Sequence, residues 1–567
     1  MPSLVLGPLL RHVDSGSATV WVETDRRCAV EVLGVTAPTW CVAGHHYAVV
    51  CIDGLAAGSS TPYEVRLDGE RVWPDPESPY PPSRIRTVDP DRPLRLVFGS
   101  CRAAEPRSWT PTTLFGADAL DTYAERMAGL PADQWPDALL LLGDQVYADE
   151  TSPITQRRIR ERRDVSQPPY TQVADFEEYT YLYHESWSDP QLRWLLSTLP
   201  TSMIFDDHDV HDDWNTSQAW REDMEATDWW AERITGALMA YWVYQHLGNL
   251  APDALAANEV YQQVRAAADA EPVLREFAKA ADREADGEKG AQWSYRRDFG
   301  RTRLLMIDSR CGRILAEQHR SMVSEPEFRW IESQVDGEYD HLLVGTSLPW
   351  LLPRAIHDVE SADEALCAGR RWRWRWRWLV RLGERLRCGA DLEHWAAFRE
   401  SFDRLARLIG RVAAGGYEGG RPPATVCVLS GDVHHAYVAR ARYPDPVPGA
   451  VYQLVCSPVH QEVPRSMRFG FRVGWSRPAE LLGRLACRLA GVPPLPLSWD
   501  RVAGPFFGNQ LATLTIDGRS ARLAFECAAP VDQQQTARMQ PIAEVTLSPS
   551  PTAIKEPSSA LKIDKRR

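Results

Sequence analysis

The first 90 residues alternate apolar and polar positions in short runs that are separated by turn residues. The runs are SATVWVET from Ser17, CAVEVLGV from Cys28, HYAVVCI from His46 and PYEVRLDGERVW from Pro62. In the last run, Asp68-Gly69 separates two alternating segments, and this dipeptide favours a hairpin because both turn positions adopt positive φ. The pattern predicts a small antiparallel β-sandwich over residues 1–90.

A proline-rich stretch from Trp73 to Pro93 follows, and we expect a stiff linker there because proline favours extended backbone. Beyond it the chain carries continuous apolar runs, each followed by a polar or glycine-rich loop. These runs end at Cys101, Tyr147, Asp209, Arg310, Trp350 and His435. Apolar runs without alternation predict strands buried on both faces, and helical patterns lie between them. We therefore predict a layered α/β domain over residues 91–546 and a disordered tail over residues 547–567.

The composition is that of a globular protein. The 567 residues are 44% hydrophobic, which is enough for more than one core, and the formal net charge is −13. Nucleic-acid binders usually show a basic excess that neutralises phosphates, so we expect no nucleic-acid partner. The 11 cysteines include no C-x-x-C pair and the first residues show no export signal, so we expect reduced thiols and a cytoplasmic location. No apolar run approaches the ~20 residues that a membrane-spanning helix needs.

One segment, Arg370 to Trp378, alternates arginine and tryptophan with strict period two. It has two interpretations. A surface of this kind can touch lipid or another anionic partner peripherally, through the indole rings and the guanidinium groups. Alternatively, the run is a repeat expansion within an insertion whose tryptophans pack on the domain. We favour the second interpretation, because compositional bias alone is weak support for a function.

Several loops that follow the apolar runs carry groups able to bind a cation. Asp144 comes directly after one run, with Tyr147 three residues later, and a carboxylate can bridge two cations about 3.5–4 Å apart. The loop FDDHDVHDDWN holds five aspartates, and so many like charges repel unless cations or hydrogen bonds neutralise them. Its interleaved histidines, His208 and His211, favour a metal site over a solvated acidic loop.

Two further loops extend the set. In SGDVHHAY, Asp432 and His434 are two residues apart and therefore lie on one side of an extended backbone. Cys101 ends the first central run with Arg102 beside it; a buried inert thiol is the default for a lone cysteine, but cations would deprotonate it. Because ligands bind at the carboxyl ends of strands in open α/β sheets, we expect these loops to converge on one crevice.

The ordered motifs VFGSC, LGDQVYAD, FDDHDVHDDW, IDSR and LSGDVHHAY resemble those of the alkaline phosphatase D (PhoD-like) family of calcineurin-like metallophosphoesterases. The resemblance implies a four-layer α/β/β/α catalytic core, preceded by a small β-sandwich of the immunoglobulin or fibronectin type III kind. It also implies a multinuclear metal centre of Fe³⁺ with Ca²⁺, for which Mn²⁺ and Zn²⁺ are alternatives.

Transferred motif by motif, the resemblance assigns roles to individual residues. Cys101, Asp144 and Tyr147 would hold the iron-like site, Asp207 would lie near the second metal, and Asp432 and His434 would complete the cluster. His208 would protonate or stabilise the leaving oxygen and would be oriented by Asp209. Arg310, and less clearly Arg102, would neutralise phosphate oxygens.

The chain departs from this family in two respects. Characterised members are typically exported, whereas no export signal is visible here. In addition, Asp391 to Trp395 reads DLEHW where the family usually has a Trp-Asp-Gly-Tyr run. This second segment is expected to border the substrate pocket.

The motifs and the resemblance together predict a metal-dependent hydrolase in which a metal-activated hydroxide attacks a small phosphoester, either a monoester or a diester. There is no G-x-S-x-G elbow for a serine hydrolase and no Walker-type loop for a nucleotide hydrolase. Two alternatives are a phospholipase-like phosphodiesterase at lipid surfaces and a catalytically weak phosphoester-binding scaffold. No oligomeric state is predicted.

Overall fold

The computed structural model describes residues 1–104, 115–287, 290–316, 319–368, 383, 387, 392–418, 420–463, 465–530 and 537–547. The Arg370–Trp378 repeat lies outside these residues, as do residues 548–567 of the predicted tail. Among the described helices, none has both the length and the apolar character needed to cross a bilayer.

The N-terminal region consists of two antiparallel sheets that face each other. One sheet has the order β1 (Leu4–Val13), β2 (Ala18–Thr24), β6 (His45–Ile52) and β5 (Trp40–Val42). The other has the order β4 (Val35–Pro38), β3 (Ala29–Val32), β8 (Val65–Leu67) and β9 (Glu70–Trp73). Side chains from both sheets, among them Val20, Val30, Val50 and Val65, form one buried cluster between them. The predicted hairpin is present, with φ of 49° at Asp68 and 89° at Gly69.

The stretch predicted to be a linker is more ordered than expected. It contains a strand, β10 (Arg84–Arg86), which pairs antiparallel with β7 (Ser60–Pro62) of the N-terminal region. The ring nitrogen of Trp73 also donates a 3.0 Å hydrogen bond to Ser83 Oγ. The prolines therefore do not separate two independent bodies.

Two larger sheets follow and pack face to face. The first has the order β13 (Thr201–Ile204), β12 (Ala138–Leu142), β11 (Leu94–Gly99), β21 (Gln510–Asp517), β22 (Ser520–Pro530) and β23 (Ala537–Leu547). The second has the order β14 (Tyr295–Phe299), β15 (Thr302–Met306), β16 (His341–Gly345), β17 (Thr425–Ser430), β19 (Ala450–Val455), β18 (Ala436–Arg442) and β20 (Ser498–Phe506). The central strands β11–β13 and β15–β17 run parallel within their sheets. A shared core that includes Phe98, Leu140, Leu343 and Leu429 fills the space between the sheets.

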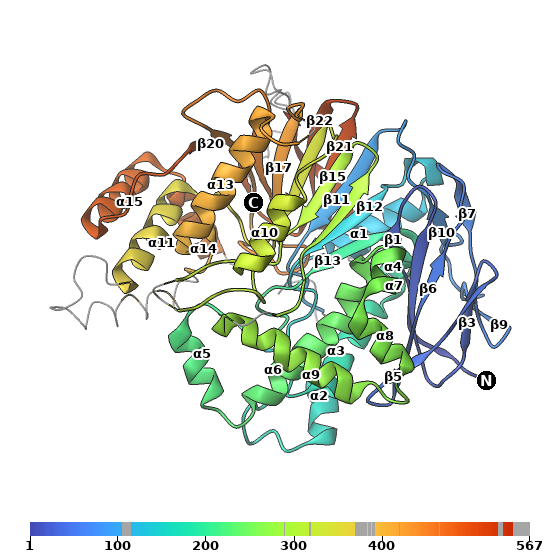
Figure 1. The fold of residues 1–567 in the computed structure, drawn as a ribbon. Coiled ribbons are helices and arrows are strands. Elements are labelled where there is room, and N and C mark those ends of the chain that lie inside the picture. The colour runs from blue at the N-terminus through green and yellow to red at the C-terminus, as the bar shows by residue number, and fades with distance from the viewer. Residues whose placement is uncertain are drawn as a thin grey trace, which may run out of the picture.

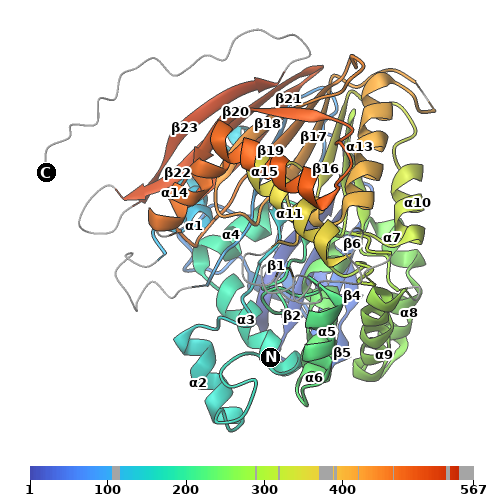
Figure 2. The same ribbon diagram turned by 90° about the vertical axis from the view of Figure 1, so that its left-hand side faces the viewer.

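Helices cover the outer face of each sheet. On the first sheet they include α1 (Ala119–Ala128), α3 (Phe176–Trp187), α4 (Pro190–Thr198) and α6 (Trp230–Ala240). On the second they include α10 (Glu325–Ser333) and α13 (Arg399–Ala414). Figures 1 and 2 show the sheets between these two sets of helices. The predicted four-layer α/β/β/α architecture, preceded by an antiparallel β-sheet region, is therefore confirmed.

Eight further α-helices are described. They are α2 (Pro153–Arg162), α5 (Gln218–Glu225), α7 (Pro252–Ala257), α8 (Glu259–Ala266), α9 (Glu271–Asp282), α11 (Arg354–Cys367), α14 (Arg465–Gly474) and α15 (Arg477–Ala490). The N-terminal sheets are not separate from this domain, because Trp21 and Tyr47 belong to the same buried cluster as the helices of the first layer. Arg11 of β1 also donates to the backbone carbonyls of Thr201 and Tyr244, at 3.1 and 2.7 Å.

Candidate metal centre

The predicted site residues follow the carboxyl ends of strands in both sheets. Cys101 follows β11, Asp144 follows β12, Asp207 follows β13 and Asp432 follows β17. The backbone is left-handed at Cys101, Asp144, Asp432 and His434, with φ between 49° and 66°. Such backbone is unfavourable for residues with a Cβ and is concentrated at functional sites in folded proteins. The strand ends thus bring Asp144, Asp207 and Asp432 close together, as the motif order predicted.

Four buried or half-buried aspartates form the centre of the site. Asp144, Asp206, Asp207 and Asp432 each offer an oxygen atom, and these four atoms all lie within 4.8 Å of one another. Burial and then the neighbouring carboxylates raise the pKa of Asp144 well above its usual range. Among the described residues, neither Asp144 Oδ1 nor Asp206 Oδ2 has a hydrogen-bond partner, although both atoms are buried. Unpaired buried carboxylate oxygens are costly, so this donor set fits cations.

Side chains with other donor atoms, a thiol sulfur, a phenol oxygen and an imidazole nitrogen, lie near the aspartates. The Cys101 thiol is fully buried, lies 3.2 Å from Ser100 Oγ, and has a pKa raised by burial and then by Asp144 and Asp432. Tyr147 has a raised pKa for the same first cause and donates its hydroxyl hydrogen to Gln461. Burial lowers the pKa of His434 to about 4, so this ring is neutral, as a metal ligand must be. A bound cation would favour the thiolate and phenolate forms. These ligand assignments stay predictions.

His208 is oriented by Asp149 rather than by Asp209, which corrects the expectation from the motif. His208 Nδ1 lies 3.0 Å from Asp149 Oδ2, and its ring centre is 4.7 Å from that of Tyr147. Burial would lower the pKa of His208, but the charges of Asp149 and Asp207 outweigh it and raise the pKa well above its usual value.

Asp209 instead holds the site loops together. Its two oxygens accept the backbone N–H groups of Asp144, Gln145, Val146 and Asp206 at distances from 2.9 to 3.3 Å. Burial raises the pKa of this carboxyl to about 7, and these donors oppose the shift. The side chain is completely buried, so Asp209 has a structural role: it connects the loops that carry the aspartate cluster and has no contact with solvent.

The two arginines expected to contact phosphate are occupied by the protein. Arg310 is completely buried; its Nε lies 2.5 Å from Asp206 Oδ1 and one terminal nitrogen lies 3.1 Å from Asp207 Oδ1. Arg102 donates to Asp118 Oδ2 at 2.8 Å and to the backbone oxygen of Ser186 at 3.1 Å. Arg310 therefore offsets the negative charge of Asp206 and Asp207. These contacts do not support a phosphate-binding role for either arginine.

Two parts of the chain match known family models. Residues 117–342 match the family model described as PhoD-like phosphatase. Residues 117–342 thus form a PhoD-like phosphatase domain. Residues 1–85 match a second family model, described as a domain of unknown function, DUF7800. A search of curated protein sequences finds no match.

One solved structure shares the fold of nearly the whole chain. The structure of PhoD superposes with a TM-score of 0.58 at 12% sequence identity, and the match covers 98% of this chain and 93% of that one. A purple acid phosphatase, PPD1, from yellow lupin (Lupinus luteus) seeds matches with a TM-score of 0.48 at 10% identity, over 95% of this chain and 74% of that one. At these identities the likeness to PhoD concerns the fold.

The structure also places beside the aspartate cluster two residues that the motifs did not assign, Glu393 and His394. His394 Nε2 lies 2.9 Å from Asp432 Oδ2, and its Nδ1 lies 2.9 Å from Glu360 Oε1. Glu393 pairs with Arg310 and with Arg313. Both residues come from the DLEHW segment, so the sequence signal for them was the departure from the family pattern itself. A buried histidine in contact with Asp432, a candidate metal ligand, is a feature of this chain's own site.

Proposed function

We propose that the protein is a metal-dependent hydrolase of small phosphoesters. The observation that carries the proposal is the cluster of four aspartates at the strand ends, with two buried carboxylate oxygens that no described residue satisfies. The PhoD-like phosphatase domain supports the same reaction class. Of the candidate metals, Fe³⁺ with Ca²⁺ suits the mixture of phenol, thiol and carboxylate donors, and Mn²⁺ or Zn²⁺ are the alternatives.

Each group of residues has a defined task in this proposal. Asp144, Asp206, Asp207 and Asp432 would hold the cations, together with Cys101, Tyr147 and His434. Bound cations would supply a nucleophile from water at neutral pH and neutralise charge on the phosphoryl oxygens.

His208 would act on the leaving group. Asp149 holds its Nδ1, so Nε2 is the nitrogen left to carry the proton that the leaving oxygen receives. The buried Arg310 keeps Asp206 and Asp207 in place and offsets their repulsion. A binding scaffold would not need the His208 and Asp149 pair, which favours turnover over binding alone.

The test is hydrolysis of p-nitrophenyl phosphate and of its bis ester by wild type, His208→Ala and His211→Ala. His211 is a matched control, because its ring stacks on Trp229, 6.2 Å away between centres, and its Nδ1 contacts the Asp212 carbonyl. We expect His208→Ala to keep its metal and lose about 10²–10⁴-fold in kcat, while His211→Ala stays near wild type.

The ratio of the two ester rates decides between monoesterase and diesterase. Equal activity of His208→Ala and wild type would remove His208 from the mechanism. Metal-loaded wild type that hydrolyses neither ester would favour the binding scaffold.

A further inference from the structure

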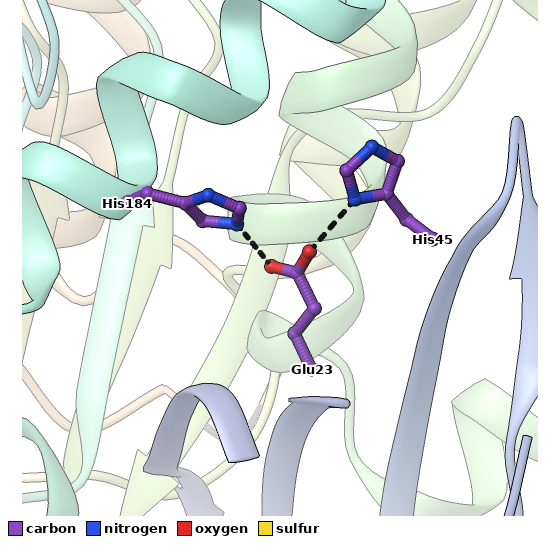
Figure 3. Close-up of side chains that lie close together, drawn as sticks. All are labelled: Glu23, His45 and His184. Carbon is purple, nitrogen blue, oxygen red and sulfur yellow. Dashed lines mark hydrogen bonds and ion pairs between the residues drawn. The ribbon is translucent and has the colours of Figure 1, made fainter. Parts of the chain in front are cut away.

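A second cluster of metal-ligating side chains lies where the N-terminal sheets meet the catalytic domain, away from the aspartates. It consists of Glu23 on β2, His45 on β6 and His184 on α3. Figure 3 shows the two imidazole rings on either side of the Glu23 carboxylate, with one ring nitrogen of each aimed at it. His45 Nδ1 lies 3.0 Å from Glu23 Oε1, and His184 Nε2 lies 2.9 Å from Glu23 Oε2.

Neighbouring side chains form hydrogen bonds to His45 and Glu23, as neighbours of metal ligands do in metal sites. His45 Nε2 lies 2.8 Å from Glu177 Oε2, so a carboxylate holds the ring nitrogen that faces away from Glu23. Tyr244 donates its hydroxyl hydrogen to Glu23 Oε2 at 3.2 Å. Metal-binding histidines almost always donate their other N–H to such a partner, and metal-binding carboxylates are themselves hydrogen-bonded.

Burial and charge also suit a cation. The Glu23 side chain is 1% exposed, and its charge is compensated by the two histidines that contact it, a task that a bound cation would take over. The side chains of His45 and His184 are 19% and 18% exposed, which leaves a route from solvent. Two neutral imidazoles with the carboxylates of Glu23 and Glu177 would be balanced by one divalent ion.

We infer that Glu23, His45 and His184 bind one divalent cation of the zinc class, which fastens the N-terminal sheets to helix α3. Their ligand atoms lie within 4.8 Å of one another, so modest side-chain shifts bring them to the ~2.0–2.2 Å distances of zinc sites. Imidazole nitrogens favour zinc or nickel over calcium or magnesium. The site is independent of phosphoester hydrolysis.

The test is isothermal titration of Zn²⁺ into the full chain carrying Asp144→Asn and Asp432→Asn, which disables the aspartate cluster. We expect one equivalent of Zn²⁺ to bind in this host. Addition of His184→Gln or His45→Gln should weaken binding by about 100-fold, and addition of Glu177→Gln by about 10-fold or more. His46→Gln is the matched control, because neighbouring residues of a strand point to opposite faces; it should bind like the host.

Circular dichroism checks that each variant folds, and the two histidines belong to different elements, so one misfolded variant leaves the other informative. The inference is overturned if the host binds no Zn²⁺. It is also overturned if one equivalent of Zn²⁺ still binds after each of the two histidine substitutions. In either case the cluster is a hydrogen-bonded histidine and glutamate network that joins the two regions.

A different observation concerns the helix pair α14 and α15, residues 465–490. The large apolar side chains most exposed on it, each at least 41% exposed, are Met467, Phe469, Val473, Leu481, Leu482, Leu485 and Leu489. The opposite side of the pair is packed: a Cβ at Gly483 would meet Asp358 of α11 at 2.9 Å, and Phe471 stacks on His435 with ring centres 4.5 Å apart. Figure 1 shows α15 at the edge of the molecule far from the N-terminal sheets.

Arginines accompany these apolar side chains. Residues 465–490 contain six arginines and one glutamate, although the whole chain has a net charge of −13. Arg472, Arg477 and Arg484 are exposed. A second copy of the chain on this face would place arginines against arginines. An anionic surface would instead receive them, and exposed leucine and phenylalanine among arginines are typical of helices that lie in a membrane interface.

We infer that the α14–α15 pair binds the surface of anionic lipid bilayers. The test is sedimentation of the full chain with vesicles of phosphatidylcholine alone and of phosphatidylcholine with phosphatidylserine. We expect binding to the anionic vesicles only, weakened by added salt. The variant Leu481→Ser with Leu485→Ser should lose binding. Leu130→Ser is the matched control, because Leu130 is 37% exposed and lies elsewhere, and it should bind like wild type.

Absence of wild-type binding to the anionic vesicles overturns this inference. Binding that the Leu481 and Leu485 substitutions do not weaken also overturns it and moves the contact to another segment. A concentration-dependent dimer that these substitutions dissociate identifies a second copy as the occupant and overturns it as well.

Discussion

Substitution of Asp209 separates a structural role for this residue from a catalytic one. Its oxygens accept four backbone N–H groups from the loops that carry Asp144 and Asp206, in a position with no solvent exposure. An unsatisfied buried donor costs about 1–3 kcal/mol. With partial relaxation, Asp209→Ala should lower the free energy of unfolding by about 4–6 kcal/mol. Asp209→Asn keeps one oxygen, so two of the four donors face an amide NH₂, and the loss should be about half as large.

The assay is urea unfolding of chelated protein followed by circular dichroism, with metal content measured before chelation. We expect Asp209→Ala to lose stability and metal together, because the loop that presents Asp144 loses its anchor. A variant with wild-type stability and metal content but reduced kcat would refute this reasoning and return Asp209 to a role beside His208.

Three further predictions test other parts of the structure. Burial lowers the pKa of His246 to about 3, so the folded chain keeps this ring neutral while the unfolded chain protonates it below pH about 6.5. This pKa difference leaves the free energy of unfolding unchanged above pH about 6.5. Below that pH it lowers the free energy of unfolding by about 1.4 kcal/mol per pH unit. His246→Phe should therefore flatten the acid side of the stability profile, and parallel profiles would contradict the prediction. Asp149→Asn should lower kcat about 10²-fold with little change in metal content, and an unchanged kcat would show that His208 needs no such partner. At Gly143 φ is 109°, and an added Cβ would lie 2.7 Å from Asp206 Cβ. Gly143→Ala should therefore lower the free energy of unfolding in urea by about 3 kcal/mol, whereas Gly129→Ala should have a mild effect. Equal effects of the two substitutions would count against a strained turn at Gly143.

The sequence was most informative where periodicity and motif order agree. Continuous apolar runs predicted strands buried on both faces, and they form the central strands of the two facing sheets. The motif order predicted that Asp144, Asp207 and Asp432 converge, because each follows a strand that ends at the same side of its sheet.

Contacts between distant segments could not be predicted from the sequence. The partner of His208 is Asp149, which is 59 residues away and follows a neighbouring strand, whereas the family resemblance assigned this role to Asp209. Arg310 was expected to face substrate, but its burial beneath Asp206 and Asp207 depends on how two sheets meet. The cluster of Glu23, His45 and His184 joins three separate segments and leaves no local motif.

The central claim, that bound metal at the aspartate cluster drives phosphoester hydrolysis, has a direct test. The purified chain is stripped with a chelator, reloaded with Fe³⁺ and Ca²⁺, Mn²⁺ or Zn²⁺, and assayed with p-nitrophenyl phosphate and its bis ester alongside Asp144→Ala. The account predicts that stripping abolishes turnover, that reloading restores it, and that Asp144→Ala neither retains metal nor recovers. Turnover that survives complete removal of metal, or that Asp144→Ala retains, would contradict it.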